Sequence, residues 1–426
     1  MKKLIIILTG LAFIILSLPT QSYAIPAFAR KYGFNCNMCH TAYTRLNDFG
    51  QRYRDNGYQI PGQEGKEKNV FDLSSPIAMR LTMGYDLYDA DQGSASGFNL
   101  YGFDFFAAGV LHKNISFLLI YTPRIDEPAA DYTGSNGGTN PAQLAGLESV
   151  SLIFSNIVQD ALNVRVGRFE PSYHAFSSKR SYYLFQPYEI YTLTTPANSY
   201  SFDDNQIGIE ATGHFRSGFK YGLGIVNGNG ANADNNTNKD IFFNLSKTFG
   251  PGDGQSSGQR LGVFGYYGWQ AADTVVGIVA PTGTADSKSS KSFYRYGVNG
   301  SFNYSTWNLQ LLYMQGVDDK AFNVVDRTKN YEYSGGFAEL DYAGLLDNRL
   351  VASVLYNWTS APSLTLEHQT EYPNNQISAY SLLARYYLGD WSAVNISAHA
   401  EFTHREVGKS DKIKENIFLL ALDFAF

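Results

Sequence analysis

From about residue 75 to the last residue, hydrophobic and polar side chains alternate one by one in segment after segment. A period of two, with one hydrophobic row and one polar row, predicts β-strands that separate lipid from water. We count about 16 such segments, an even number as bacterial outer-membrane barrels require. The pattern therefore predicts an all-β transmembrane barrel of antiparallel strands, porin-like, over residues 73–426. The clearest hydrophobic rows lie at 77–85, 101–105, 115–121, 162–166, 207–211, 307–313, 394–402 and 418–426.

The connections between these segments alternate in length. Short turns are expected at 112–114, 216–218, 303–306 and 389–390, and long polar loops at 122–145, 170–205, 227–239, 271–291, 316–330 and 360–374. Outer-membrane barrels keep short turns in the periplasm and long loops outside, which predicts that both termini are periplasmic. A soluble β-sandwich, the competing interpretation, has no reason to alternate in this way. The aromatic C-terminal residue Phe426 resembles the signal that the barrel insertion machinery reads.

The third long loop, residues 169–205, is rich in aromatic residues and carries Lys179 and Arg180. It resembles the inward-folded constriction loop of general porins. The alternative is an ordinary outer loop, and the sequence leaves both open.

The N-terminal part has a different pattern. Residues 1–24 predict a secretory signal peptide, because Lys2 and Lys3 precede a hydrophobic run and a small-x-small cleavage site. Residues 25–72 predict a small helical segment and a linker. Residues 27–31 favour a short helix, and a second is expected from the helical spacing of Tyr43, Leu46, Phe49 and Tyr53, ending at Asn56 and Gly57.

Composition narrows the function classes only a little. Charged residues make up 17% of the chain and aromatic residues 15%, with 40 glycines, which is typical of an exported β-barrel. The net charge of −6 argues against a nucleic-acid partner.

Both of the chain's 2 cysteines lie in the sequence Cys36-Asn37-Met38-Cys39-His40. This is the C-x-x-C-H attachment signature of a c-type haem. The two thiols would form thioethers to the porphyrin, and His40 would be the proximal iron ligand. The alternatives are a disulfide or half of a zinc site, but no further soft ligands lie nearby at zinc spacing. The expected cofactor is therefore one covalent haem c.

Other haem contacts are less defined by sequence. Arg30 and Lys31 either neutralise the haem propionates or form a solvated basic pair. By alternation, Met79 and Met83 face lipid. Four possible distal ligands face the lumen, and two of these, His112 and His214, lie near the periplasmic rim. Each of the four is either a distal ligand or an ordinary lumen-lining residue: His214, His112, Met314 and His399.

The stretch from Ala24 to His40 resembles the opening of the fused cytochrome–porins, a family that includes outer-membrane iron oxidases. The shared residues are Ala24, Pro26, Phe28-Ala29-Arg30, Gly33 and the C-x-x-C-H motif. The chain departs at Lys31 and Tyr32, where iron oxidases of this family usually carry Gln and Thr, so the resemblance bears on architecture more than on the electron donor. It implies one haem c per chain and electron transfer between an external donor and a periplasmic c-type cytochrome.

These expectations lead to a working hypothesis. A single haem relays electrons across a membrane only if it lies partway through, so the N-terminal segment is expected to plug the barrel lumen. The chain would oxidise an extracellular donor such as Fe(II), or pass electrons outward to an external acceptor. Alternatives from other classes are a diffusion porin with a haem-bearing plug and a haem peroxidase with an open sixth position. A homotrimer is expected by analogy with porins of this strand number.

Overall fold

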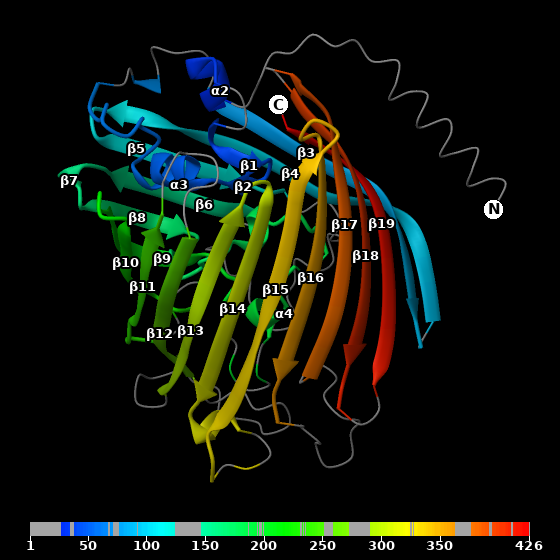
Figure 1. The fold of residues 1–426 in the computed structure, drawn as a ribbon. Coiled ribbons are helices and arrows are strands. Elements are labelled where there is room, and N and C mark those ends of the chain that lie inside the picture. Colours follow the sequence, from blue (N-terminus) through cyan, green and yellow to red (C-terminus); the bar gives the residue numbers. More distant parts are fainter. Residues whose placement is uncertain are drawn as a thin grey trace.

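The computed structural model describes most of the predicted barrel and part of the N-terminal segment (Figure 1). The signal peptide and Cys36 lie outside the described residues, as does the side chain of Arg30. The described residues are 27–34, 38–66, 69–70, 76–91, 93–123, 146–185, 187–193, 195, 198, 200–230, 232, 234, 236–250, 259–271, 290–323, 326, 328–362, 376–391, 394–409 and 412–425.

Within these residues, sixteen strands form one closed antiparallel barrel, which confirms the predicted fold class. The first barrel strand pairs with the last one, so no edge strand remains for lipid to contact. The barrel strands are β3 (Ile77–Ala90), β4 (Gly93–His112), β5 (Ile115–Tyr121), β6 (Leu147–Phe154), β8 (Asn163–Phe169), β9 (Gln206–His214), β10 (Phe219–Val226), β11 (Asp240–Phe249), β12 (Gln259–Ala271), β13 (Ser290–Tyr304), β14 (Trp307–Asp318), β15 (Tyr331–Leu345), β16 (Leu350–Ser360), β17 (Gln376–Trp391), β18 (Val394–Val407) and β19 (Ile413–Ala425).

The remaining elements are short. In the part of the chain that is described, no helix has the length and apolar character needed to span a bilayer. The helices are α2 (Ala27–Tyr32), α3 (Asp48–Asp55), η4 (Ser178–Arg180), α4 (Glu189–Thr192) and η5 (Lys320–Phe322), and the short strands are β1 (His40–Ala42), β2 (Arg45–Leu46) and β7 (Ile157–Asp160).

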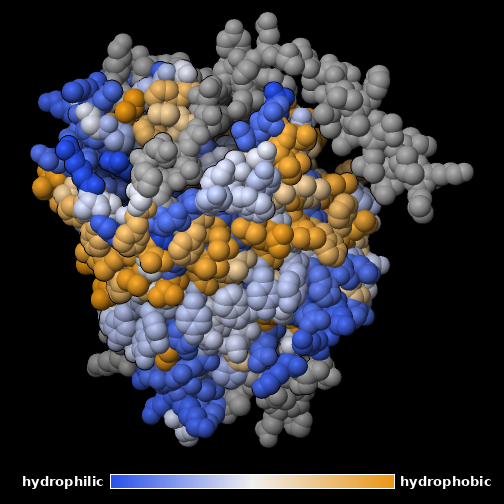
Figure 2. Space-filling model, in the orientation of Figure 1, coloured by the Kyte–Doolittle hydropathy of each residue, from blue (hydrophilic) through white to orange (hydrophobic). Residues whose placement is uncertain are grey.

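The strands alternate as the sequence predicts. On β9, Ile209 is 53% exposed on the outer face, whereas Glu210 is 1% exposed on the lumen face. Met83 lies on the exposed outer row, and Met314 and His399 are buried on the lumen side, also as predicted. Figure 2 shows the outward residues as a hydrophobic band around the visible face of the barrel. A lipid-facing band of this kind is typical of a bacterial outer-membrane protein.

The two rims of the barrel differ. The start of β3 and the end of β19 lie at one rim of the barrel, together with the short turn between β4 and β5 (Figure 1). We call this the short-turn rim. The predicted alternation of loop length has two exceptions at the opposite, long-loop rim. The β3–β4 and β18–β19 connections are short there, because these strands extend as hairpins instead of ending in a long loop.

Residues 170–205, here called the inward loop, fold into the lumen, as in the constriction-loop interpretation. Tyr173, Ile190 and Tyr191 are fully buried. The Tyr183 hydroxyl lies 3.0 Å from the Ser353 hydroxyl of β16, and the Arg405 Nε of β18 donates to Glu189 at 2.6 Å. The aromatic residues of the loop thus pack against the far wall of the barrel.

Residues 38–66, here called the plug, also lie inside the lumen, at the short-turn rim. The short helix predicted at residues 27–31 is confirmed as α2, whereas the second predicted helix is correct only for α3. Residues 40–46 instead form the β1–β2 hairpin, with His40 paired to Leu46. The helix begins later than predicted because Asn47 is its N-cap, with the side-chain Oδ1 accepting from the Gly50 N–H at 2.8 Å.

Candidate functional site

The plug is folded tightly around the end of the C-x-x-C-H motif. In α3, Gly50 lies directly against the backbone of Cys39, and a Cβ at position 50 would fall 2.1 Å from the Cys39 carbonyl oxygen. The Asn47 N–H donates to this same carbonyl at 2.9 Å. Cys39 and helix α3 therefore hold a fixed relative position.

Replacing Gly50 by alanine should loosen this contact. Alanine favours a helix interior by about 1 kcal/mol over glycine, but the carbonyl of Cys39 leaves no room for its Cβ. We expect faster protease cleavage within the plug of the folded protein. Gly97→Ala is the matched control, because nothing lies within 4 Å of a Cβ there. Unchanged cleavage in Gly50→Ala would contradict the described packing.

An aromatic cluster holds the plug against the wall of β4–β6. Tyr53 and Tyr58 are buried beside Ala108 and Ile153 of the wall. Phe28 of α2 stacks on Tyr58, with 4.9 Å between ring centroids. These hydrophobic contacts bring helix α2 and the end of α3 to one side of the lumen.

An ion cluster holds the plug against the opposite side. The Arg45 guanidinium contacts the carboxylates of Glu339, at 2.6 Å, and Asp341, both on β15. It also lies over the Tyr182 ring of the inward loop, 4.2 Å from its centroid. Because all of these side chains are buried, the contact ties the plug, the loop and the wall together.

The C-terminal end of α3 is anchored to β9 and β10. The Asp55 carboxylate lies 3.0 Å from His214 Nε2 and 2.7 Å from Lys220 Nζ. Burial alone would raise the pKa of Asp55, but Lys220, Arg54 and His214 hold it well below its usual range. Asp55 is therefore ionised at neutral pH and binds the wall as an anion.

The plug also binds the inward loop directly. The Thr44 hydroxyl lies 2.9 Å from the carbonyl oxygen of Ser181 and 3.1 Å from that of Arg180. Plug and loop thus form one packed unit across the lumen, and two small cavities lie beside them.

His40 lines one of these cavities, which has a volume of about 200 Å³. Its Nδ1 lies 3.2 Å from the Thr44 carbonyl oxygen, which orients the ring. Burial lowers the pKa of His40 to about 4, so the imidazole is neutral at physiological pH. Burial raises the pKa of the neighbouring Cys39 thiol to about 11.

The wall that His40 faces across the cavity is unusual for a barrel lumen. Phe106 of β4 and Leu118 and Ile120 of β5 supply an apolar patch. Five basic side chains line the same cavity, Arg54, Arg80, Arg165, Lys179 and Arg180, together with the carboxylates of Asp104, Glu148 and Glu170. The edge of the cavity thus carries an excess of basic over acidic side chains beside an apolar wall, which suits a flat apolar ligand that carries negative groups.

These residues fit a haem c. An imidazole whose Nδ1 bonds a backbone carbonyl is the usual arrangement of a metal-ligating histidine. The apolar patch suits the porphyrin face, and the basic side chains suit its propionates. Arg54, Arg180 and Lys179 would hold those groups from the plug and the inward loop.

The other haem contacts predicted from the sequence are not brought together. Lys31 lies over its neighbour Tyr32, with Nζ 4.7 Å from the ring centroid, and does not line the His40 cavity. None of the four possible distal ligands lines that cavity either. His214 binds Asp55 as described, His399 Nε2 lies 3.0 Å from Glu401, and Met314 is buried in the aromatic core.

The fourth possible distal ligand, His112, is exposed at the end of β4 and not turned into the lumen as predicted. A register shift after Val110 pairs it with Ile115, the first residue of an outward row. This bulge breaks the alternation on which the prediction depended.

Sequence reasoning missed the apolar patch, although a signal was present. Strand β5 reads Ile-Ser-Phe-Leu-Leu-Ile-Tyr and is hydrophobic on both faces after its second residue. A strand between lipid and water needs only one such face. The second hydrophobic row indicated that something apolar lies inside the barrel at this point.

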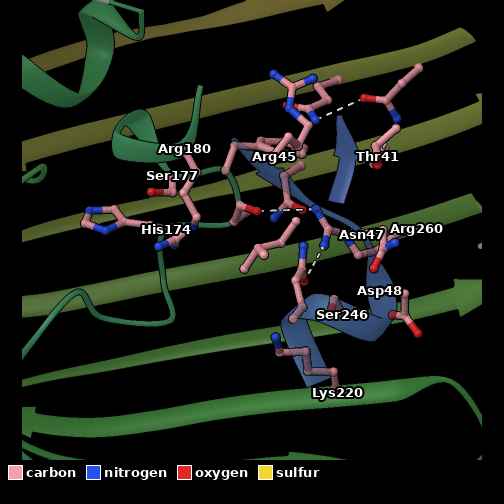
Figure 3. Close-up of a pocket in the computed structure, with 18 of the residues that line it drawn as sticks. Thr41, Arg45, Asn47, Asp48, His174, Ser177, Arg180, Lys220, Ser246 and Arg260 are labelled. Carbon is pink, nitrogen blue, oxygen red and sulfur yellow. Dashed lines mark hydrogen bonds between the residues drawn. The ribbon is translucent and has the colours of Figure 1, made fainter. Parts of the chain in front are cut away.

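A second cavity of about 120 Å³ lies between the plug, the inward loop and strands β10–β14; we call it the chamber. Figure 3 shows Arg45, Asn47 and Asp48 of the plug and Arg260 of the wall around it. His174 of the inward loop lines the chamber as well, and burial lowers its pKa to about 4.

Comparisons with known proteins show the fold alone. No family model matches the chain, and no curated protein matches it. Among solved structures, an anion-selective porin from Comamonas acidovorans aligns with a TM-score of 0.56 at 12% identity, covering 83% of this chain and 99% of the porin. OmpF of Salmonella typhi aligns with a TM-score of 0.55 at 10% identity, covering 84% and 100%. OmpT of Vibrio cholerae, in a trimer form, gives 0.51 at 10% identity, covering 82% and 99%.

Proposed function

We propose that the chain is an outer-membrane electron-transfer protein that carries one covalent haem c inside its barrel. Cys36 and Cys39 would bind the porphyrin and His40 the iron. The haem would supply a one-electron Fe(III)/Fe(II) couple. The extracellular partner would be an electron donor such as Fe(II), and the other partner a periplasmic c-type cytochrome.

The position of His40 carries this proposal. A histidine that ends a C-x-x-C-H motif lies within the lumen, with its ring oriented by a backbone carbonyl, in a cavity with an apolar wall and an edge that carries more basic than acidic side chains. Nothing in the ordinary working of a diffusion porin requires this combination. A redox group held partway through the barrel is what transfer across the membrane demands.

The chain's own residues have defined roles in this proposal. Thr44 orients the His40 ring through its carbonyl oxygen. Arg45 and Asp55 fix the plug at opposite walls. The buried aromatic residues of the inward loop exclude water from the lumen beyond the plug. A dry, fixed surrounding raises the influence of nearby charges on the potential of a bound redox group.

The test uses haem-loaded protein in sealed vesicles that contain a soluble oxidised c-type cytochrome. Fe(II) added outside at neutral pH should reduce the protein's haem and then the enclosed cytochrome, as followed by stopped-flow absorbance. Vesicles without the protein are the control. If dithionite reduces the haem and an external acceptor re-oxidises it, but Fe(II) does not react, outward transfer would be favoured. No exchange with any external reagent would contradict electron transfer.

A diffusion porin with a haem-bearing plug is the second candidate, and the porin-like fold favours it. The packed plug and inward loop oppose it. We therefore expect the full chain to show conductance far below that of an open 16-stranded porin in planar bilayers. Porin-like conductance of the full, haem-loaded chain would support this candidate. A trimer, the form in which Vibrio OmpT was solved, would appear in light scattering of the detergent-solubilised protein.

A further inference from the structure

The chamber is separate from the His40 cavity and has its own chemistry. Its lining is polar and includes basic side chains from three parts of the chain: Lys220 and Arg260 of the wall, Arg54 and Arg45 of the plug, and Arg180 of the inward loop. Asp48 is its one lining carboxylate among the described residues. Four of the five cations already have acidic partners.

Arg260 is the exception. Across the described chain, no carboxylate lies within ion-pair distance of its guanidinium. Its Nη atoms donate only to Gln51 Oε1 and to the Ala175 carbonyl oxygen, both at 3.3 Å, and its buried Nε has no acceptor. A guanidinium has five N–H donors, so most of them are unused here. Asp48 is the carboxylate that acts most strongly on Arg260, but no ion pair joins the two, so the desolvated guanidinium has no anion in direct contact, which is unfavourable.

Buried amides of the wall point to a ligand at the same place. Asn299 and Gln310 are each 5% exposed and line the chamber. Neither amide atom of Asn299 has a hydrogen-bond partner in the described structure, and Gln310 Oε1 has none either. Asn244, 8% exposed, also has an unpartnered Oδ1. Buried polar groups in proteins are normally bonded, so these atoms indicate missing polar occupants. Asn299 Nδ2 is a donor and needs an acceptor, whereas the three amide oxygens need donors, which ordered water supplies.

We propose that the chamber binds one small oxyanion of the sulfate or phosphate class, with Arg260 and Asn299 as its main ligands. Water would satisfy the amide oxygens, but water alone would leave Arg260 without an anion in direct contact. An oxyanion accepts charge-assisted hydrogen bonds from a guanidinium and further bonds from an amide N–H. Lys220 and Arg180 add positive potential around it. This inference does not depend on the proposed electron transfer.

The test is isothermal titration of haem-loaded, full-length protein in detergent with sodium sulfate, at constant ionic strength maintained with chloride. We expect one sulfate per chain for the unaltered protein. Arg260→Gln should weaken binding about tenfold or more, because it removes the charge-assisted bonds. Arg349→Gln is the matched control, since Arg349 is exposed in the β15–β16 turn outside the chamber, and should bind as the unaltered protein does.

Asn299→Asp provides a second variant that keeps the side-chain shape. Its carboxylate would compete for Arg260, so sulfate binding should be lost while the heat-modifiable gel migration of a folded barrel is retained. Absence of sulfate binding to the unaltered protein would overturn the proposal, as would equal affinity in Arg260→Gln. Binding only to the haem-free chain would also overturn it, because a haem propionate would then be the occupant; Arg54 and Arg180 line both cavities.

Discussion

Cys36→Ala combined with Cys39→Ala should leave the exported chain with no covalently bound haem, while the barrel still folds. The physical reason is that each thioether needs a thiol, and the sequence contains no other cysteine. The mass of the purified chain should fall to that of the polypeptide alone, and the haem absorption bands should be absent. The fold of the barrel is checked by its heat-modifiable migration in gels.

Met38→Leu is the matched control for this variant. Met38 lies between the two cysteines, is 40% exposed, and offers no thiol. Its replacement changes the side chain within the motif but removes neither attachment point, so the haem mass should remain. A haem adduct on the double alanine variant would show that the motif is not the attachment site. A missing adduct on the unaltered protein would remove the basis of the proposed function.

Arg45→Met should release the plug from the barrel wall. Glu339 and Asp341 are 0% and 3% exposed, and the Arg45 guanidinium contacts both. Removing one partner of a buried ion pair typically costs about 3–5 kcal/mol, because the remaining charge stays buried without compensation. We expect rapid proteolysis of residues 38–66 in folded protein, with the barrel itself intact.

Arg52→Met is the matched control for Arg45→Met. Arg52 is on the same plug but is partly exposed, and its ion pair with Asp160 spans 3.8 Å. Exposed pairs of this kind contribute about 0–1 kcal/mol, so the plug should remain protected. Adding Glu339→Gln and Asp341→Asn to Arg45→Met should restore part of the protection, because no buried charge is then left alone. Equal protection in Arg45→Met and Arg52→Met would contradict the anchoring role of Arg45.

The barrel could be predicted from the sequence because its signal is local. Alternation on a strand such as β9 is set by lipid on one side and water or packed residues on the other, and it needs no knowledge of distant parts of the chain. Where a bulge interrupts the alternation, as between Val110 and His112, the prediction places the next side chain on the wrong face of the sheet. The strand order follows from adjacency, since antiparallel neighbours are joined by turns.

The plug could be expected inside the lumen from the sequence, but the contacts that hold it there could not be predicted. They pair residues far apart along the chain, such as Arg45 with Glu339 and Asp55 with His214. No local pattern specifies such pairs. The helical spacing of Tyr43 and Leu46 was misleading for the same reason, because the β1–β2 hairpin depends on the Thr44 contact with the inward loop. The roles of Cys36, Cys39 and His40 as haem ligands stay predictions.

The pairing of β3 with β19 has a consequence for biogenesis. An exported chain emerges with its N-terminal end first, whereas the cylinder is sealed only when its final strand arrives. The thiols of the motif and the His40 imidazole are therefore accessible in the periplasm throughout translocation. Any enzyme that modifies this first segment must therefore act before the final strand closes the barrel.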